Sequence, residues 1–193
     1  KNIFLSKLSN KKKLKRFSIL IIGGSQGAKI FDNLFRKDLV KISKKFKIKI
    51  FHQTSSENVN SIKKFYLMKN IESYVFSYKK DIHKIIKKCD FVITRSGAST
   101  INELIFLEAP FLAIPFPFAK DDHQFFNANY YVKKKMGWLI RESELTDNFL
   151  YELVLNLIKN KRMLNQKKKS MQNFYKNYNW SENSDILRNI ILK

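Results

Sequence analysis

The chain alternates between two kinds of segment, and this alternation limits its fold more than any other feature. Short apolar runs typical of buried strands are followed by longer stretches in which apolar side chains recur at helical spacing. No hairpin signal joins one short run to the next. Repeated strand–helix–strand units of this kind predict a parallel sheet with right-handed crossovers and with helices on both faces.

The apolar runs give the expected strands, and the stretches between them give the expected helices. We expect strands over Phe17–Ile22, Ile48–His52, Tyr74–Phe76, Phe91–Thr94 and Phe111–Ile114, and a weaker one over Trp138–Ile140. We expect helices over Ala28–Lys45, Ser56–Met68, Asp81–Lys88, Thr100–Leu107 and Asp122–Lys135. From Glu144 onward the pattern is helical only, with helices expected over Leu150–Ile158, Lys161–Tyr178 and Ser181–Leu192. The predicted fold class is α/β, a doubly wound, Rossmann-like parallel sheet with extra C-terminal helices.

The formal net charge of +22 is the strongest compositional signal, and it has three interpretations. It fits attraction to an anionic membrane surface, binding to nucleic acid, or the Lys-, Asn- and Ile-rich bias of an AT-rich coding sequence. Only six of the 38 basic residues are Arg, the side chain best suited to bidentate recognition of bases and phosphates. The scarcity of Arg argues against a nucleic-acid partner.

The single cysteine, Cys89, excludes an internal disulfide framework and fits a reducing compartment. It stands at the end of a predicted helix, just before a predicted strand. A small buried residue is the ordinary occupant of such a position, and a cysteine nucleophile is the functional alternative. No run approaches the roughly 20 apolar residues that span a bilayer.

In open α/β sheets, ligands bind beyond the carboxyl ends of the strands, so the loops that follow the strands carry the function. The first such loop is Gly23-Gly24-Ser25-Gln26-Gly27-Ala28. Its glycines allow a tight turn and a close approach of the backbone to a ligand. The Ser25 hydroxyl and the free N–H groups of the following helix favour an anion such as a diphosphate. The alternative is a glycine-rich turn without a ligand.

The second loop runs from Thr94 to Thr100 and is rich in small and hydroxyl side chains. Glu103 lies on the same helical face as Ser99 and Thr100. A carboxylate there would accept hydrogen bonds from the two hydroxyls of a ribose. The alternative is a capping box between Ser99 or Thr100 and Glu103, which would serve the helix itself.

The third loop, from Pro115 to Gln124, leads into a helix whose first turns carry His123, Gln124 and Asn127. These polar side chains suit the hydroxyls of a sugar, with Asp121 or Asp122 capping the helix. A fourth loop, Ser77-Tyr78-Lys79-Lys80-Asp81, carries no clear side-chain signal. A nucleobase would be bound there through backbone groups.

Taken together and in this order, the loops resemble those of the MurG family of peptidoglycan N-acetylglucosaminyltransferases. The resemblance rests on the glycine loop, on Arg95-Ser96-Gly97-Ala98 with Thr100 and Glu103, and on Pro115 with His123-Gln124 and Asn127-Ala128. It implies one half of a GT-B glycosyltransferase, which transfers N-acetylglucosamine (GlcNAc) from UDP-GlcNAc to lipid I, with inversion, to give lipid II.

The resemblance also implies a role for each site residue. Ser25 would contact the diphosphate, Glu103 the ribose, His123 and Gln124 the sugar, and the backbone of Lys79 the uracil, although the family usually has an apolar residue there. The expected UDP-GlcNAc contacts are Ser25, Lys79, Ala98, Ser99, Thr100, Ile101, Asn102, Glu103, His123 and Gln124.

By the same resemblance, residues 1–193 form the C-terminal UDP-sugar-binding domain, with 1–16 as linker or domain entry, 17–140 as the α/β core and 141–193 as C-terminal helices. The acceptor domain and the catalytic base would lie upstream. We expect no metal and no cofactor. The expected partners are UDP-GlcNAc, lipid I and an anionic membrane surface, without nucleic acid, at the cytoplasmic side of the bacterial plasma membrane. The alternatives are a stand-alone catalytic subunit of a two-chain glycosyltransferase and a basic nucleic-acid-binding module.

Overall fold

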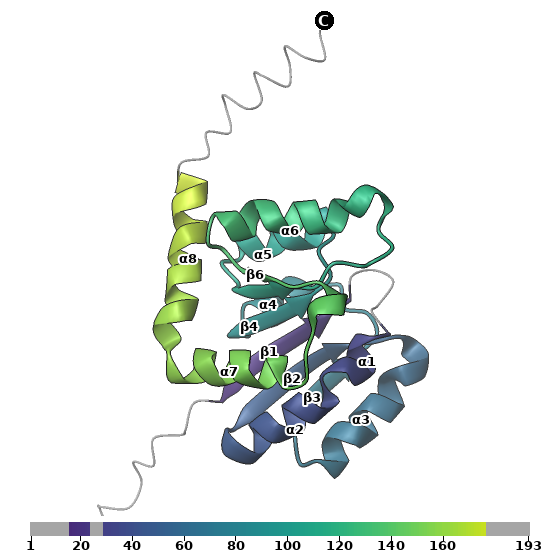
Figure 1. Cartoon of the computed structure of the whole chain (residues 1–193). Coiled ribbons are helices and arrows are strands. Elements are labelled where there is room, and N and C mark those ends of the chain that lie inside the picture. The colour runs from purple at the N-terminus through teal and green to yellow at the C-terminus, as the bar shows by residue number, and fades with distance from the viewer. Residues whose placement is uncertain (1–15, 24–28, 177–193) are drawn as a thin grey trace, which may run out of the picture.

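The protein is built on one parallel sheet of six strands in the order β3-β2-β1-β4-β5-β6 (Figure 1). The computed structural model describes residues 16–23 and 29–176. The strands are β1 Phe17–Ile22, β2 Ile48–Gln53, β3 Glu72–Phe76, β4 Phe91–Thr94, β5 Phe111–Ala113 and β6 Trp138–Leu139. All six predicted strands are confirmed, and the predicted parallel pairing is confirmed along the whole sheet.

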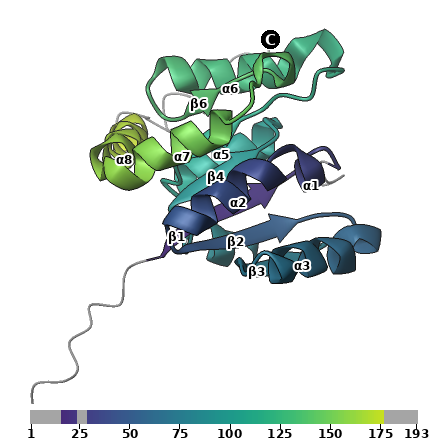
Figure 2. The same cartoon turned by 60° about the horizontal axis from the view of Figure 1, so that its bottom comes forward.

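Helices cover both faces of the sheet, as Figures 1 and 2 show. One face is covered by α1 Phe31–Leu34, α2 Arg36–Lys45, α3 Val59–Met68 and α7 Phe149–Lys159. The other face is covered by α4 Ile82–Ile86, α5 Ala98–Phe106 and α6 His123–Lys133. Each face has its own apolar core because the side chains of a strand alternate between the two faces. Thus Ile19 and Ile21 point into one core, and Leu20 and Ile22 point into the other.

The first predicted helix is two helices in the structure. The backbone turns at Phe35, where φ is −107° and ψ is 8°, between α1 and α2. At this turn the Nε of Arg36 donates a hydrogen bond of 2.7 Å to the carbonyl oxygen of Asp32. Phe31, Phe35 and Leu39 follow one another at intervals of four residues and are all buried, so both helices keep an apolar side on the sheet.

One glycine is required by packing at the end of the sheet. A Cβ atom on Gly137 would lie 2.6 Å from the ring of Phe111, which is fully buried in β5. The missing side chain lets the chain pass against this ring as it enters β6. Register then pairs Leu112 with Trp138 and completes the sheet.

Helix α8 (Lys161–Lys176) runs along the side of the molecule and reaches both cores (Figure 1). Leu164, near its start, belongs to the core beneath α2 and α7, whereas Met171, two turns later, belongs to the core beneath α5 and α6. The predicted helix from Lys161 is therefore confirmed as far as Lys176. The predicted helix over 181–192 lies outside the described residues.

Candidate functional site

The three loops singled out above leave the sheet side by side. β1, β4 and β5 are neighbours, and register pairs Ile22 with Thr94 and Thr94 with Ala113. The chain therefore leaves the sheet at Gly23, Arg95 and Ile114 along one edge. The glycine loop after Gly23, with the predicted phosphate contact Ser25, lies in residues 24–28, outside the described residues.

Helix α5 begins next to this edge with an N-terminus that no side chain caps. Its N-cap is Gly97, and the first backbone N–H group bonded within the described residues is that of Ile101, to the Gly97 carbonyl at 3.0 Å. The N–H groups of Ala98, Ser99 and Thr100 are thus left for a ligand. Because Ser99 and Thr100 lie inside the helix, the capping-box alternative is wrong. An open first turn of this kind suits an anionic group.

The next residues of α5 differ in what they offer. Glu103 is half-buried, and its carboxylate has no hydrogen-bond or ion-pair partner within the described part of the chain. Asn102 accepts a hydrogen bond of 2.6 Å from the Tyr131 hydroxyl, so its side chain joins α5 to α6. Ile101 is buried and its N–H group is already used, which gives its side chain a packing role. Of these three, Glu103 has the side chain that is most available to a ligand.

Gln124 holds two of the loops together through one oxygen atom. Its Oε1 accepts hydrogen bonds from the backbone N–H of Phe116, at 3.0 Å, and from that of Ser96, at 3.3 Å. Asn127, one turn later, donates to the Ser96 carbonyl oxygen at 3.3 Å. The amide nitrogen of Gln124 has no partner among residues 16–23 and 29–176. Gln124 therefore fixes the start of α6 against the start of α5 and keeps two N–H donors for a ligand.

His123 is exposed at the first position of α6 and has a fixed tautomer. Its Nδ1 lies 2.8 Å from the carbonyl oxygen of Lys120, which only accepts hydrogen bonds. Nδ1 therefore carries the proton, and Nε2 of the neutral ring is left as an acceptor. An acceptor beside the donors of Gln124 suits a sugar hydroxyl, which both donates and accepts.

The turn before α6 is strained and is held by an ion pair. Asp121 and Asp122 have φ values of 49° and 51°, a left-handed conformation that non-glycine residues rarely adopt. Arg141, which follows β6, contacts both carboxylate oxygens of Asp122, at 2.5 and 3.2 Å. Its hydrogen bonds hold the pKa of Asp122 below the ordinary value. The expected capping hydrogen bond of Asp121 or Asp122 is absent from the described structure, and the pair with Arg141 takes its place.

Arg95 is central to the site, and sequence reasoning missed its role. Its guanidinium donates to the carbonyl oxygens of Ile114, at 3.1 Å, and Pro115, at 2.8 Å, and forms an ion pair with Glu142. It also lies over the rings of Phe31 and Phe116, with its Cζ atom 5.0 and 5.5 Å from their centroids. Arg95 is buried, so it positions the loops and does not present its charge to a ligand. No local pattern signals this role, since its hydrogen-bond partners are 19 and 20 residues away.

A second buried polar cluster lies beside β2, where Asp32 is the central residue. Its Oδ2 accepts hydrogen bonds of 2.8 Å from Thr54 and Asn58, and Nε2 of His52 lies 3.3 Å from its Oδ1. Nδ1 of His52 lies 2.8 Å from the Tyr66 hydroxyl. Burial alone raises the pKa of Asp32, but His52 and the two hydrogen bonds outweigh it and hold the pKa below its ordinary value. This cluster anchors α1, the helix that follows the glycine loop.

Two residues named above lie apart from this group. Lys79 is exposed in the loop after β3, and β2 and β1 separate that edge strand from β4. Lys79 thus lies at the carboxyl ends of the strands, like the other predicted site residues, but its side chain is not brought to theirs. Cys89 is buried, and burial raises the pKa of its thiol to about 12, which favours the packing interpretation over the nucleophile.

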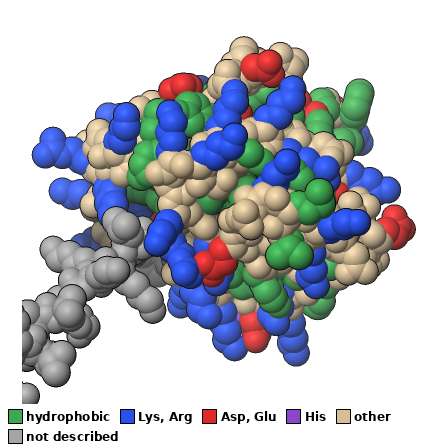
Figure 3. Space-filling model, turned by 90° about the horizontal axis from the view of Figure 1, so that it is seen from below, with side chains coloured by type: hydrophobic (Ala, Val, Ile, Leu, Met, Phe, Trp, Pro, Cys, Tyr) green, Lys and Arg blue, Asp and Glu red, His purple; other side chains and the backbone are tan. Residues whose placement is uncertain are grey.

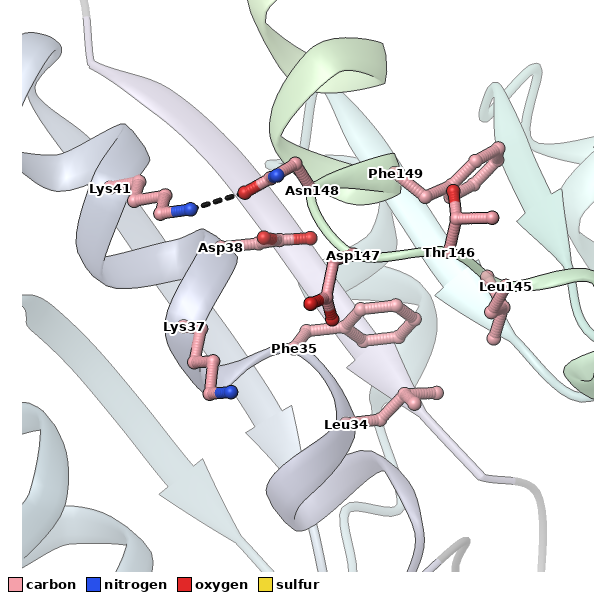
Figure 4. A pocket seen from close by; sticks show the side chains of 10 residues that line it. All are labelled: Leu34, Phe35, Lys37, Asp38, Lys41, Leu145, Thr146, Asp147, Asn148 and Phe149. Atoms are coloured by element: carbon pink, nitrogen blue, oxygen red, sulfur yellow. Dashed lines mark hydrogen bonds between the residues drawn. The ribbon is translucent and has the colours of Figure 1, made fainter.

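A cavity of about 250 Å³ lies between α2 and the segment before α7 (Figure 4). Asp38 lines it, and the Asp38 carboxylate accepts hydrogen bonds from the N–H groups of Leu150 and Tyr151 at 3.1 and 3.3 Å. Burial raises the pKa of Asp38. Lys41 bonds across the cavity to Asn148, as Figure 4 shows. These contacts anchor the start of α7, and none of the described residues of the expected UDP-GlcNAc site lines this cavity. In residues 16–23 and 29–176 no group of three or more His, Cys, Asp or Glu side chains is arranged to hold a metal ion.

The fold and the loops at this edge are those of one class of protein domain. It is the doubly wound α/β domain, in which loops at the carboxyl ends of the central strands bind nucleotides. Residues 18–180 match the family model "Glycosyltransferase family 28 C-terminal domain". Because the match covers most of the chain, the chain belongs to this family.

Similar proteins agree with this assignment. The chain is 44% identical over 178 residues to the UDP-N-acetylglucosamine–N-acetylmuramyl-(pentapeptide) pyrophosphoryl-undecaprenol N-acetylglucosamine transferase of Pelagibacter ubique, which covers 92% of the chain and 50% of that relative. It is 37% identical over 153 residues to the enzyme of the same name from Rickettsia canadensis, covering 78% and 43%. The crystal structure of Acinetobacter baumannii MurG matches with a TM-score of 0.74 and 28% identity, covering 85% and 49%. The chain thus spans about half the length of the relatives it matches.

Proposed function

We propose that this chain supplies the UDP-GlcNAc site of an enzyme that transfers GlcNAc to lipid I and so forms lipid II. The observation that carries the proposal is the uncapped first turn of α5 lying directly beside the start of α6, where Gln124 joins the two. One helix start offers N–H donors for a diphosphate, and the other offers side chains for a sugar. The similarity to lipid II-forming transferases supports the choice of donor and acceptor.

Each group at this edge of the sheet contacts one part of the donor. The N–H groups of Ala98, Ser99 and Thr100, with Ser25 from the glycine loop, hold the two phosphates, and Glu103 accepts hydrogen bonds from the ribose hydroxyls. The sugar lies against the Gln124 amide and Nε2 of His123. The uracil is held by the backbone around Lys79, and Asn102 supports the site by joining α5 to α6.

The same groups stabilise the leaving group when the glycosidic bond of the donor breaks. Negative charge then develops on the diphosphate of the departing UDP, and the α5 helix N-terminus faces that charge. The pre-arranged N–H groups need no reorganisation at this step. We assign the chain the donor side only, and we place the acceptor site and the catalytic base in the part of the relatives that it does not match.

A titration calorimetry series tests the donor assignment. UDP-GlcNAc and UDP should bind the chain more tightly than ADP-glucose. ADP-glucose lacks the uracil that both carry, and it also lacks the N-acetylglucosamine of UDP-GlcNAc. Glu103→Ala should weaken UDP-GlcNAc binding by about 1.5–3 kcal/mol, since a charge-assisted hydrogen bond is lost. Glu152→Ala, a carboxylate change on the exposed side of α7 and outside the site, is the matched control. Equal binding of UDP-GlcNAc and ADP-glucose at about millimolar concentration would refute the proposal.

We also propose that the enzyme acts as a peripheral protein at the cytoplasmic face of the plasma membrane, where its lipid acceptor is anchored. Figure 3 shows Lys and Arg side chains spread over the face seen from below, with few Asp and Glu among them. Such a surface is attracted to anionic phospholipid. Within the described residues, no helix has the length and apolar character needed to cross a bilayer.

A further inference from the structure

Helix α6 carries an aromatic ridge on its outer side. Phe126 and Tyr130 are four residues apart and so lie on one side of the helix, where 61% and 52% of their surface is exposed. Ala128, which points to the opposite side, is fully buried against the sheet. The outer side of a helix on a globular domain is ordinarily polar, so two neighbouring aromatic rings there make a candidate contact surface.

The ridge continues into a group of positive charges. Lys133 and Lys134 follow Tyr130 on the same side of α6, and both are exposed. Nζ of Lys134 lies 5.0 Å from the centroid of the Tyr130 ring, so the ammonium group stands over the aromatic ring. No Asp or Glu occurs between His123 and Arg141. The ridge therefore presents aromatic rings and ammonium groups without a neighbouring carboxylate on its own segment.

We propose that this ridge, defined as Phe126, Tyr130, Lys133 and Lys134, docks the protein on an anionic phospholipid surface. Aromatic rings are favoured at the level of the lipid headgroups, where one side is apolar and the other is wet. Lysines extend their stems along apolar surface and place the ammonium group on anionic headgroups. The inference rests on the proposed function in one respect, because the acceptor proposed there is a membrane lipid.

Charge selects the lipid surface over a second copy of the chain. Two copies that met through this ridge would bring the same lysines together, on a protein whose formal net charge is already +22. An anionic bilayer instead supplies the opposite charge over a wide area. Positive charge alone does not single out this face, since Figure 3 shows lysines on another face as well. Phe116 and Phe118 form another exposed aromatic pair, but Asp121 and Asp122 follow it closely in the sequence. Exposed rings together with lysines, on a segment without a carboxylate, distinguish α6.

The chain offers a matched control at the end of α3. Leu67 and Met68 are 77% and 68% exposed, and they also lie next to lysines, with Lys64 before them and Lys69 after them. Replacing these two side chains removes as many exposed apolar groups as replacing Phe126 and Tyr130. The positive charge of both helices stays unchanged.

The test is sedimentation of the whole chain with vesicles of phosphatidylcholine that contain about one third phosphatidylglycerol, compared with phosphatidylcholine alone. We expect binding to the anionic vesicles only. The double variant Phe126→Ser with Tyr130→Ser should lower the partition coefficient about tenfold, and Lys133→Ser with Lys134→Ser should lower it and weaken its salt dependence. Leu67→Ser with Met68→Ser should change it less than about twofold.

Three results would overturn the docking surface. The first is an aromatic variant that binds vesicles like the wild type, and the second is an equal loss of binding in the α3 control. The third is a wild-type chain that is a dimer without lipid while only the aromatic variant is a monomer, which would assign the ridge to a second copy. UDP-GlcNAc titration without vesicles separates this inference from the proposed function. All variants should bind the donor like the wild type, so a chain that binds vesicles through α6 but no UDP-GlcNAc would refute the function and leave the surface standing.

Discussion

The ion pair between Arg95 and Glu142 joins the ends of two strands that are not neighbours in the sheet. Arg95 follows β4, Glu142 follows β6, and β5 lies between them. The same guanidinium bonds the carbonyl oxygens of Ile114 and Pro115 at the end of that middle strand. One buried side chain thus fixes three adjacent strand ends, and with them the loops that face the candidate donor site.

Removing this guanidinium should cost both stability and binding. Arg95→Met keeps the stem but leaves Glu142 and two carbonyl oxygens without their partner, so the free energy of unfolding should fall by about 3 kcal/mol. UDP-GlcNAc affinity should fall as well, because the β5 loop loses its anchor. Urea unfolding and calorimetry measure the two effects. Glu142→Gln should cost clearly less, and an equal cost would show that the ion pair, rather than the carbonyl contacts, dominates.

Two substitutions at Gln124 should separate its two roles. Gln124→Glu keeps an oxygen for the N–H groups of Ser96 and Phe116 but removes the amide donor, so it should bind UDP-GlcNAc weakly and unfold like the wild type. Gln124→Leu also removes the acceptor and should lower the free energy of unfolding by about 1–3 kcal/mol. Urea titration distinguishes them. Full donor affinity in Gln124→Glu would remove the amide from the proposed sugar site.

Acid should destabilise the fold partly through Asp32. Because its folded-state pKa lies below the ordinary value, the charged carboxylate adds stability above the unfolded pKa of about 3.9, and this stability is lost as the pH falls through the folded-state pKa. Asp32→Asn lacks this contribution. The difference in unfolding free energy between wild type and variant should therefore shrink from pH 6 to about pH 2.5. A difference that is constant with pH would mean that hydrogen-bond shape, and not charge, matters there.

The thiol of Cys89 should react slowly in the native state. Burial raises its pKa to about 12, so at pH 8 the thiolate is scarce and the sulfur is also shielded. Labelling with a thiol-specific disulfide reagent should be at least ~100-fold slower in the folded chain than in urea. Cys89→Ala gives the background signal. Rapid labelling of the folded chain would revive the nucleophile interpretation.

The sequence was most informative where the determining pattern is local. The apolar runs predicted β1 and β4 with their observed bounds, because burial on both faces of a parallel strand favours a nearly continuous apolar run. At the start of α5 the capping-box alternative was wrong, because the helix begins before Ser99. Long-range contacts were not predictable. Nothing near Arg95 indicates Glu142, and nothing near Asp38 indicates the helix that it anchors 112 residues later.

The predicted site residues divide in the same way. Glu103 and Gln124 were expected from helical spacing and resemblance, and the structure places Glu103 in the second turn of α5 and Gln124 at the start of the adjacent α6. The use of the Gln124 oxygen by two backbone N–H groups was not expected, because those groups belong to loops 8 and 28 residues away. The site residues remain predictions that ligand binding must test.

Helix α8 couples the unfolding of the two helical layers of the domain. Leu164 and Met171 secure two cores on opposite faces of the sheet, so neither face can lose this helix alone. A protease cut after Asn160 would release α8, expose apolar side chains of both cores and leave a fragment prone to aggregation. The two layers should accordingly melt in a single cooperative transition. Trp138, whose ring lies 4.7 Å from Nζ of Lys167, is placed to report that event by its fluorescence.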